Sequence, residues 1–176
     1  MGDTEHPEAF RRGERPLTGV GHQLRPGDEA PDAVLAGKGF VPEAVRLSDY
    51  RGRVLILSCV PSLDTRVCDI ETRRWERERQ GLEGPIEILT VSMDLPFAQA
   101  RWCGAADVHH ATASSYMNEQ FAVDYGVLMK ENHLLARAVF VIDPGGRLVH
   151  AEYVHEVADQ PDYEAALEAA RRAATA

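Results

Sequence analysis

The sequence is poor in cysteine and has no long apolar segment. Its three cysteines, Cys59, Cys68 and Cys103, form no Cys-x-x-Cys pair, which argues against a simple thioredoxin or a zinc ribbon. Their odd number also argues against the disulfide framework of a secreted scaffold. The longest apolar run is far shorter than a membrane span, and residues 1–16 contain no hydrophobic stretch of the kind found in signal peptides. We therefore expect a soluble, cytoplasmic protein that does not bind membranes.

Basic blocks and metal-ligand spacings are also missing. The formal net charge is −9, so we expect no nucleic-acid partner. The alternating Glu and Arg residues from Glu71 to Arg79 predict a solvated helix face. The adjacent His109 and His110 have no companions at metal-ligand spacing, so we interpret them as polar residues entering a strand. We expect neither a metal nor another cofactor.

The length of 176 residues is that of one ordinary domain. Residues 1–16 are rich in charge and predict a flexible N-terminal arm, which leaves residues 17–176 as a single domain. Glycine and proline are frequent in residues 17–53, and this predicts short strands and turns, including an N-terminal β-hairpin, before the core.

From residue 54 onward the hydrophobic pattern predicts a regular succession of strands and helices. The predicted strands are 54–60, 86–92, 137–143 and 147–154, and the predicted helices are 66–80, 94–103, 115–125 and 161–174. We expect Asp94 to cap the second helix and Gly104 to end it. Without the hairpin and the 94–104 segment, the order β-α-β-α-β-β-α is that of an α/β thioredoxin-like fold, a mixed central sheet flanked by helices.

The most informative motif follows the first apolar strand. It reads Pro61-Ser-Leu-Asp-Thr65-Arg-Val-Cys68 and leads into a predicted helix. Thr65 is a good N-cap residue, which makes Cys68 the third helical position. The unpaired N–H groups and the positive end of the helix dipole there favour the thiolate of Cys68. Because the thiolate is the nucleophilic form of cysteine, the motif predicts a reactive sulfur.

The motif Pro-x-x-x-Thr-x-x-Cys resembles the peroxidatic-cysteine signature of peroxiredoxins. The resemblance continues in Arg-Trp-Cys103-Gly, in Ala-Arg137-Ala, and in the segment from Pro161 to Leu167. Together these segments resemble the thiol peroxidase branch, atypical two-cysteine peroxiredoxins with both cysteines on one chain. The likeness extends over residues 27–167.

The resemblance implies a catalytic cycle and its partners. Cys68 would reduce hydrogen peroxide or an alkyl hydroperoxide, and Cys103 would resolve the sulfenic acid as an intrachain disulfide. A thioredoxin or a similar dithiol protein would reduce this disulfide, and the enzyme would be a homodimer active in antioxidant defence. The polarity of the helices agrees with these roles, because the predicted C-terminal position of Cys103 disfavours a thiolate.

Peroxide reduction also requires donors and a positive charge around the reacting sulfur. The backbone N–H groups of Val67 and Cys68 and the hydroxyl of Thr65 are candidate donors, and Pro61 is expected to pack over the thiolate. Arg137 opens an apolar strand, and the resemblance assigns it the role of the distant charge.

Asp69 and Glu71 follow Cys68 closely in the sequence, and their carboxylates oppose a thiolate. We expect these carboxylates to be exposed and screened by salt, so that Arg137 and the helix terminus outweigh them.

Other interpretations remain for several of these residues. Cys68 and Cys103 could serve a non-catalytic redox sensor, or the fold could be an interaction module with inert thiols. Pro61, Thr65 and Arg137 favour the enzyme, because slow sensing needs no transition-state donors.

Alternatives also remain for individual side chains. Arg66 could modulate the site, although a helix-surface role is expected, and Cys59 is expected to be a packed strand residue. It departs from the aliphatic residue usual in thiol peroxidases. A set of aromatic residues could line an apolar substrate mouth or belong to the core: Phe97, Trp102, Phe121, Tyr125 and Phe140.

Overall fold

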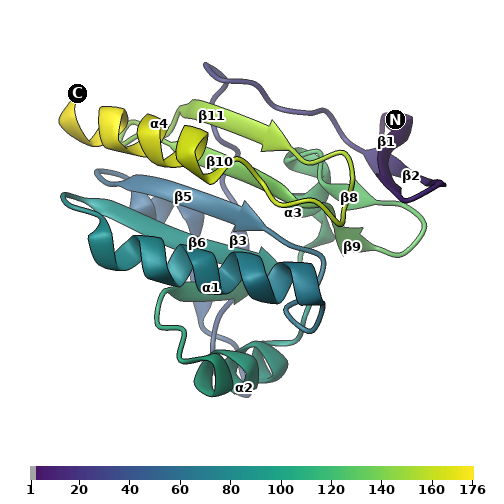
Figure 1. Cartoon of the computed structure of the whole chain (residues 1–176), viewed down its shortest axis with the longest axis horizontal. Helices are drawn as coiled ribbons and strands as arrows, with labels where there is room; N and C mark the ends of the chain where they lie inside the picture. Colours follow the sequence, from purple (N-terminus) through teal and green to yellow (C-terminus); the bar gives the residue numbers. More distant parts are fainter. Residues whose placement is uncertain (1–2) are drawn as a thin grey trace.

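The computed structural model describes residues 3–176, which form two sheets and several helices (Figure 1). The strands are β1 (Glu5–Arg12), β2 (Arg15–Val20), β3 (Val34–Ala36), β4 (Ala44–Arg46), β5 (Val54–Cys59), β6 (Ile86–Ser92), β7 (Ala111–Ser114), β8 (Leu128–Met129), β9 (Leu134–Leu135), β10 (Ala138–Ile142) and β11 (Leu148–Tyr153). The α-helices are α1 (Arg66–Gly81), α2 (Pro96–Ala106), α3 (Glu119–Asp124) and α4 (Tyr163–Thr175), and a 3₁₀ turn spans Leu47–Tyr50.

The central sheet has the strand order β11-β10-β5-β6-β7-β3-β4. The pairs β5–β6 and β6–β7 are parallel, whereas β10 runs antiparallel to both β5 and β11. Helices α1 and α4 cover one face of this mixed sheet, and α3 lies behind it (Figure 1). The predicted thioredoxin-like arrangement is therefore confirmed.

Strand β5 explains why the core has two halves. All six of its residues are buried, and alternate side chains point to opposite faces of the sheet. Val54 and Ile56 pack with α1 and α4, while Leu55, Leu57 and Cys59 belong to the cluster on the other face. Cys59 is thus an ordinary packed residue, as expected from its place in an apolar strand.

The predicted N-terminal hairpin is present, but it begins earlier than the sequence indicated. Strand β1 occupies residues that we expected to form a flexible arm, and it pairs antiparallel with β2. Strand β2 continues the pairing to β8, and the backbone of Arg11 bonds His155 and Val157. For residues 3–16 the prediction of a flexible arm was wrong, because these tertiary partners order a segment whose charge alone favoured solvent.

Helix α2 differs from its prediction at both ends. Its N-cap position is Leu95, and Asp94 accepts hydrogen bonds from the loop before α1 instead of capping α2. The helix continues past Gly104 to Ala106, and the C-cap residue Asp107 adopts a left-handed conformation with φ 56°. Glycine is tolerated inside this helix at a modest cost, so Gly104 was an unreliable end signal.

Helices α1 and α3 also differ from their predictions. The face from Glu71 to Arg79 is not uniformly solvated, since Glu71, Thr72, Trp75 and Glu76 are buried. Helix α3 begins at Glu119, four residues later than predicted, with the Asn118 side chain as its cap. Within residues 3–176, no helix has the length and apolar character needed to cross a membrane.

Candidate active site

Cys68 lies in the first turn of α1, directly after the loop that leaves β5. Its side chain is fully buried, and its sulfur packs with Val60, Leu63 and Trp102. The predicted start of the helix is confirmed, because Thr65 holds the N-cap position with extended backbone angles. The sulfur therefore lies at the end of the helix that carries the unpaired N–H groups and the positive end of the helix dipole.

Thr65 occupies the cap position without capping the helix through its side chain. Its hydroxyl lies 2.8 Å from the Cys68 sulfur and 2.9 Å from the carbonyl oxygen of Ser62. A hydroxyl has one hydrogen to donate. Because the Ser62 carbonyl and a Cys68 thiolate can only accept, Thr65 donates to one of them at a time, and its position allows donation to the thiolate.

Arg137 reaches the same sulfur from the strand side. Its Nη2 lies 3.3 Å from the Cys68 sulfur and 3.1 Å from the carbonyl oxygen of Val157. The other terminal nitrogen, Nη1, donates to the carboxylate of Glu71. The Nε–H donor is buried and has no acceptor in the described part of the chain. The guanidinium thus contacts the sulfur and also carries a buried N–H without a partner in residues 3–176.

Glu71 is a site residue that our sequence analysis misassigned. We expected an exposed carboxylate, but its side chain is fully buried and paired with Arg137. It also accepts hydrogen bonds from Ser58 Oγ at 2.8 Å and from Trp75 Nε1 at 3.3 Å. Glu71 lies three residues after Cys68, a spacing that places both on one helix face. This spacing was the signal that could have identified it.

Charge balance around Arg137 explains how a buried guanidinium remains protonated. Burial acts to lower the pKa of Arg137, but the negative charges of Glu71 and Cys68 raise it. Burial also raises the pKa of Glu71, and the Arg137 guanidinium and the donors from Ser58 and Trp75 oppose this effect. Sulfur, guanidinium and carboxylate form a buried charge network at the base of the site.

The loop between β5 and α1 is held in place by Asp94. The Asp94 carboxylate accepts from Ser62 Oγ at 2.7 Å, from the Leu63 backbone N–H at 2.9 Å and from Ser92 Oγ at 2.7 Å. This loop also carries Pro61, which is buried. Asp94 therefore fixes the segment that places Pro61 and Thr65, a supporting role that the cap prediction did not identify.

Cys103 lies in the last turns of α2 and is separated from the Cys68 environment. It is half-buried, its sulfur lies 3.9 Å from Thr112 Oγ1, and it lines a 500 Å³ cavity that contains neither Thr65 nor Arg137. Burial raises the pKa of Cys103, while Thr112 partly opposes this effect. All three cysteines are free thiols in this structure.

Trp102 connects the surroundings of the two cysteines. It packs against the small cluster that contains Cys68, and its indole N–H donates to the Asp69 carboxylate at 3.1 Å. Because Trp102 directly precedes Cys103 in the chain, these contacts link the segment that carries Cys103 to the first turn of α1.

A cavity of 620 Å³ opens over the Cys68 site. Its lining comes from the hairpin, the α1 loop and the strands β8 to β10: Arg12, Arg15, Leu17, Pro61, Thr65, Arg66, Val67, Met129, Glu131, Asn132, Leu134, Arg137 and Val157. Pro61, Thr65, Val67 and Arg137, all expected at the site, are brought together here. Arg66 is exposed and lies on the wall of this cavity.

The aromatic side chains do not form the mouth of this cavity. Phe121, Tyr125 and Phe140 are fully buried in the core, with neighbouring ring centroids 4.8 and 5.3 Å apart. Phe97 is largely exposed and pairs with Phe40, and Trp102 packs beside Cys68. The alternative that such residues are core holds for three of the five.

His109 and His110 directly precede strand β7. Within residues 3–176, no three His, Cys, Asp or Glu side chains are grouped as a metal site. His110 is buried and bonded instead to Glu76 and Thr90, which agrees with the interpretation of this histidine as a polar residue entering a strand.

Comparisons with known proteins agree with this geometry. The family model described as Redoxin matches residues 25–167. A thiol peroxidase of Halalkalibacterium halodurans is 45% identical over 159 residues, which cover 90% of this chain and 94% of the relative. A thiol peroxidase of Bacillus subtilis is 45% identical over 157 residues, which cover 89% of this chain and 92% of the relative.

Solved structures show the same similarity in three dimensions. A peroxiredoxin-like protein from Aquifex aeolicus has a TM-score of 0.86 at 31% identity, and the match covers 98% of this chain and 99% of that one. A thiol peroxidase from Chromobacterium violaceum has a TM-score of 0.80 at 19% identity, with 93% and 95% coverage, which supports the fold.

Proposed function

The chain belongs to the Redoxin family and is a thiol-dependent peroxidase, and we propose that Cys68 is its peroxidatic residue and Cys103 its resolving residue. The observation that carries this assignment is the convergence of Thr65 and Arg137 on one buried sulfur, at 2.8 and 3.3 Å. No comparable pair of donors contacts Cys59 or Cys103 in the described chain. The arrangement fits a nucleophile whose charge moves onto a substrate during reaction.

In the first step the Cys68 thiolate attacks the terminal oxygen of a hydroperoxide, ROOH. The sulfur–oxygen bond forms as the oxygen–oxygen bond breaks, so that Cys68 becomes a sulfenic acid and RO⁻ takes a proton to leave as ROH. The free Nε–H of Arg137, the Thr65 hydroxyl and the N–H groups of Val67 and Cys68 are the donors available for the two oxygens. Pro61 limits the access of water to the sulfur.

In the second step Cys103 attacks the sulfenic sulfur, which forms the Cys68–Cys103 disulfide and releases water. A dithiol protein of the thioredoxin type then reduces this disulfide and is itself oxidised. Because Cys103 lines a cavity that contains neither Thr65 nor Arg137, the two residues that contact Cys68, this step requires local unwinding of the first turn of α1 and of α2. The end of a helix and a short helix are segments that open at low energetic cost.

The substrates that we propose are hydrogen peroxide and alkyl hydroperoxides, in a cytoplasmic setting. We also propose a homodimer, for which the exposed aromatic pair Phe40 and Phe97 is a candidate contact, with ring centroids 6.3 Å apart. The donors at Cys68 favour catalysis over a non-catalytic redox sensor, because sensing by slow oxidation does not require them.

Peroxide consumption coupled to thioredoxin, thioredoxin reductase and NADPH tests this proposal. The wild-type protein should turn over repeatedly and Cys68→Ser should be inactive. Cys103→Ser should reduce about one equivalent of peroxide and then stop, whereas the matched control Cys59→Ser should turn over normally. Repeated turnover by Cys68→Ser would refute the assignment.

A further inference from the structure

The cavity above Cys68 is much larger than hydrogen peroxide. Its 620 Å³ lies in the range of pockets that hold organic ligands, whereas a water molecule in the liquid takes up about 30 Å³. Apolar side chains supply much of its wall: Leu17, Pro61, Val67, Met129, Leu134 and Val157. A site built only for hydrogen peroxide would not need this apolar volume.

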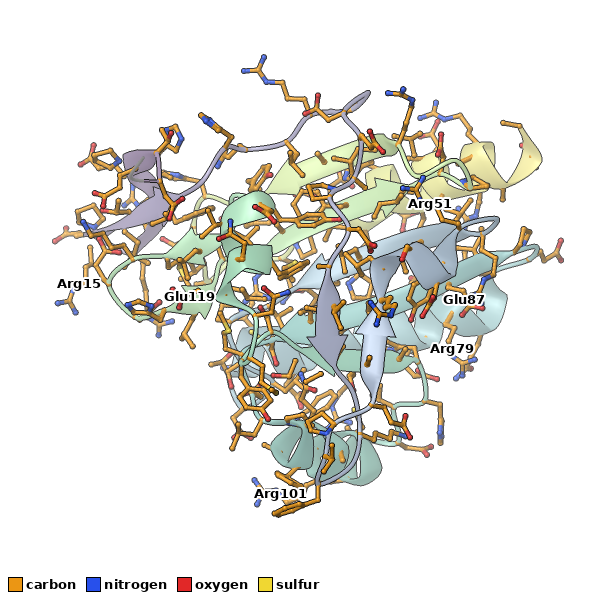
Figure 2. All side chains as sticks on the ribbon, turned by 180° about the vertical axis from the view of Figure 1, so that it is seen from behind. Arg15, Arg51, Arg79, Glu87, Arg101 and Glu119 are labelled. Carbon is orange, nitrogen blue, oxygen red and sulfur yellow. The ribbon has the colours of Figure 1, made fainter. Side chains whose placement is uncertain are left out.

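The rim of the same cavity is positively charged, in contrast to the rest of the protein. Arg12, Arg15 and Arg66 line it, and none of the three makes an ion pair in residues 3–176. Figure 2 shows Arg15 at the end of the molecule that holds the hairpin, with its side chain extending beyond the ribbon. The chain as a whole carries a formal charge of −9, so this local excess of arginine is a distinct feature.

The acidic group on the rim does not cancel this charge. Glu131 also lines the cavity, but both of its oxygens lie 2.9 Å from the backbone N–H of Thr18, which occupies the carboxylate. Arg137, deeper in the cavity, is already paired with Glu71. The rim therefore carries three arginines that form no ion pair in residues 3–176 and only one carboxylate, that of Glu131.

The hairpin that carries Arg12 and Arg15 is firmly joined to the catalytic site. The Gly13 backbone N–H donates to the Glu156 carboxylate at 2.9 Å, and the Val157 backbone N–H donates to the carbonyl of Arg11 at 3.0 Å. The carbonyl of Val157 in turn accepts from Arg137 at 3.1 Å. The cationic rim thus has a defined position relative to Arg137 and Cys68.

We propose that Arg12 and Arg15 select hydroperoxides that carry an anionic group, such as the carboxylate of a hydroperoxy acid. The peroxide group would lie at Cys68 and Arg137, the apolar chain along Leu17, Met129 and Leu134, and the carboxylate at the arginine rim. This inference rests on the proposed peroxidase reaction and adds the substrate class that the rim favours. Guanidinium is suited to this role because its fork binds carboxylates with two parallel hydrogen bonds.

The experiment compares a medium-chain hydroperoxy acid with its methyl ester, both below their micelle-forming concentrations. The readout is the ratio of the two second-order rate constants for the first turnover of the reduced protein, measured as loss of hydroperoxide. The wild-type ratio should exceed one and decrease as salt is added, because exposed charges are screened. In Arg12→Gln/Arg15→Gln the ratio should fall about fivefold at low ionic strength.

Two controls separate charge from structure. Arg12→Lys/Arg15→Lys keeps the positive charge and should retain most of the preference for the acid. Arg171→Gln removes an exposed arginine on α4, outside the lining of this cavity, and should leave the ratio unchanged. A wild-type ratio of one, or an unchanged ratio in the double glutamine variant, would overturn the inference.

The same measurements distinguish this inference from the proposed function. Normal reduction of hydrogen peroxide together with an unchanged acid-to-ester ratio would overturn the selectivity alone. A reduced wild-type protein that consumes neither hydrogen peroxide nor the hydroperoxy acid would overturn the proposed function and the selectivity together.

Discussion

Arg137 and Glu71, which stand 66 positions apart in the sequence, form an ion pair whose side chains are 1% and 0% exposed. The pair matters because the same guanidinium also lies 3.3 Å from the Cys68 sulfur. Without Glu71, the orientation of Arg137 would depend only on Val157 and on the reacting sulfur. Glu71 thus acts on the chemistry through Arg137, as a positioning residue.

Replacing Arg137 should slow the first step strongly. Loss of one donor to developing charge typically costs about a hundredfold or more in rate, and we expect this loss for Arg137→Ala. Arg137→Lys should be intermediate, because an ammonium group cannot contact Cys68, Glu71 and Val157 with the same fork. Stopped-flow peroxide reduction measures both rates. If Arg137→Ala kept its rate while Arg66→Ala lost it, the charge role would belong to Arg66.

Replacing Glu71 should affect both rate and stability. Glu71→Gln leaves the buried Arg137 without its counter-ion, and breaking a buried pair typically costs about 3–5 kcal/mol of unfolding free energy. We also expect a slower first step. The rate should depend less on pH, because the network around Arg137 then lacks the carboxylate charge of Glu71. The matched control is Glu78→Gln on the same helix, whose carboxylate pairs only with Arg74 near the surface. Equal effects of the two substitutions would contradict the positioning role.

Thr65 offers a test of the hydroxyl alone. Thr65→Val has nearly the same shape but no donor, and it should lower the rate of peroxide reduction by roughly tenfold to a hundredfold. Stability should change little, because the hydroxyl does not cap α1. Thr65→Ser restores a donor and should recover most of the rate. Full activity of Thr65→Val would show that the 2.8 Å contact with Cys68 is not used.

Oxidation with one equivalent of peroxide should produce a single intrachain disulfide. Peptide mapping without reduction should find Cys68 joined to Cys103, and Cys59 as a free thiol, because Cys59 points into the core on the other face of β5. A disulfide requires Cα atoms within about 7 Å, so hydrogen exchange should increase in the first turn of α1 and in α2. A Cys59–Cys68 link as the main product would exclude Cys103 as the resolving residue.

The decrease in the free energy of unfolding at acid pH should depend on Glu76. Burial acts to raise its pKa, but bonds from Arg79 and from the backbones of His109 and His110 lower it to about 2 from an ordinary 4.5. A lowered pKa stabilises the fold above pH 4.5, and this contribution, on the order of 3 kcal/mol, is lost as the pH falls toward 2. Burial also lowers the pKa of His110 below its ordinary 6.5. Folding stability therefore decreases further as the pH falls below 6.5, because the unfolded chain binds this proton more readily.

Denaturant unfolding of Glu76→Gln between pH 7 and pH 2 measures this contribution. The variant should be less stable than the wild type at pH 7, and the difference should shrink as the pH falls. Glu83→Gln, which changes an exposed carboxylate near the end of α1, should follow the wild-type profile. A constant difference over the whole pH range would show that the bonds to Glu76 do not depend on its charge.

Much of the site follows from local sequence, and the remainder depends on distant contacts. The continuous apolar run of β5, the N-cap position of Thr65 and the place of Cys68 in the first turn are all encoded within a short segment. The end of α2 was less predictable, since Gly104 is compatible with both a helix interior and a helix end. Asp94 likewise looked like a cap, because its loop partners Ser62 and Leu63 belong to another part of the chain.

By itself, the sequence determined the succession of strands and helices from residue 54 onward and the place of Cys68 in the first turn of a helix. Periodicity and capping depend on neighbours within a few positions, so a single chain reveals them, whereas the role predicted for Arg137 came from the resemblance to peroxiredoxins. Only the tertiary structure decided that Glu71 is buried while Glu78 on the same helix pairs at the surface. The environment of a charged side chain depends on the partners that folding brings to it. For the same reason, the contacts of the hairpin with β8 and with residues 155–157 decided that a charged N-terminal segment forms one wall of the site.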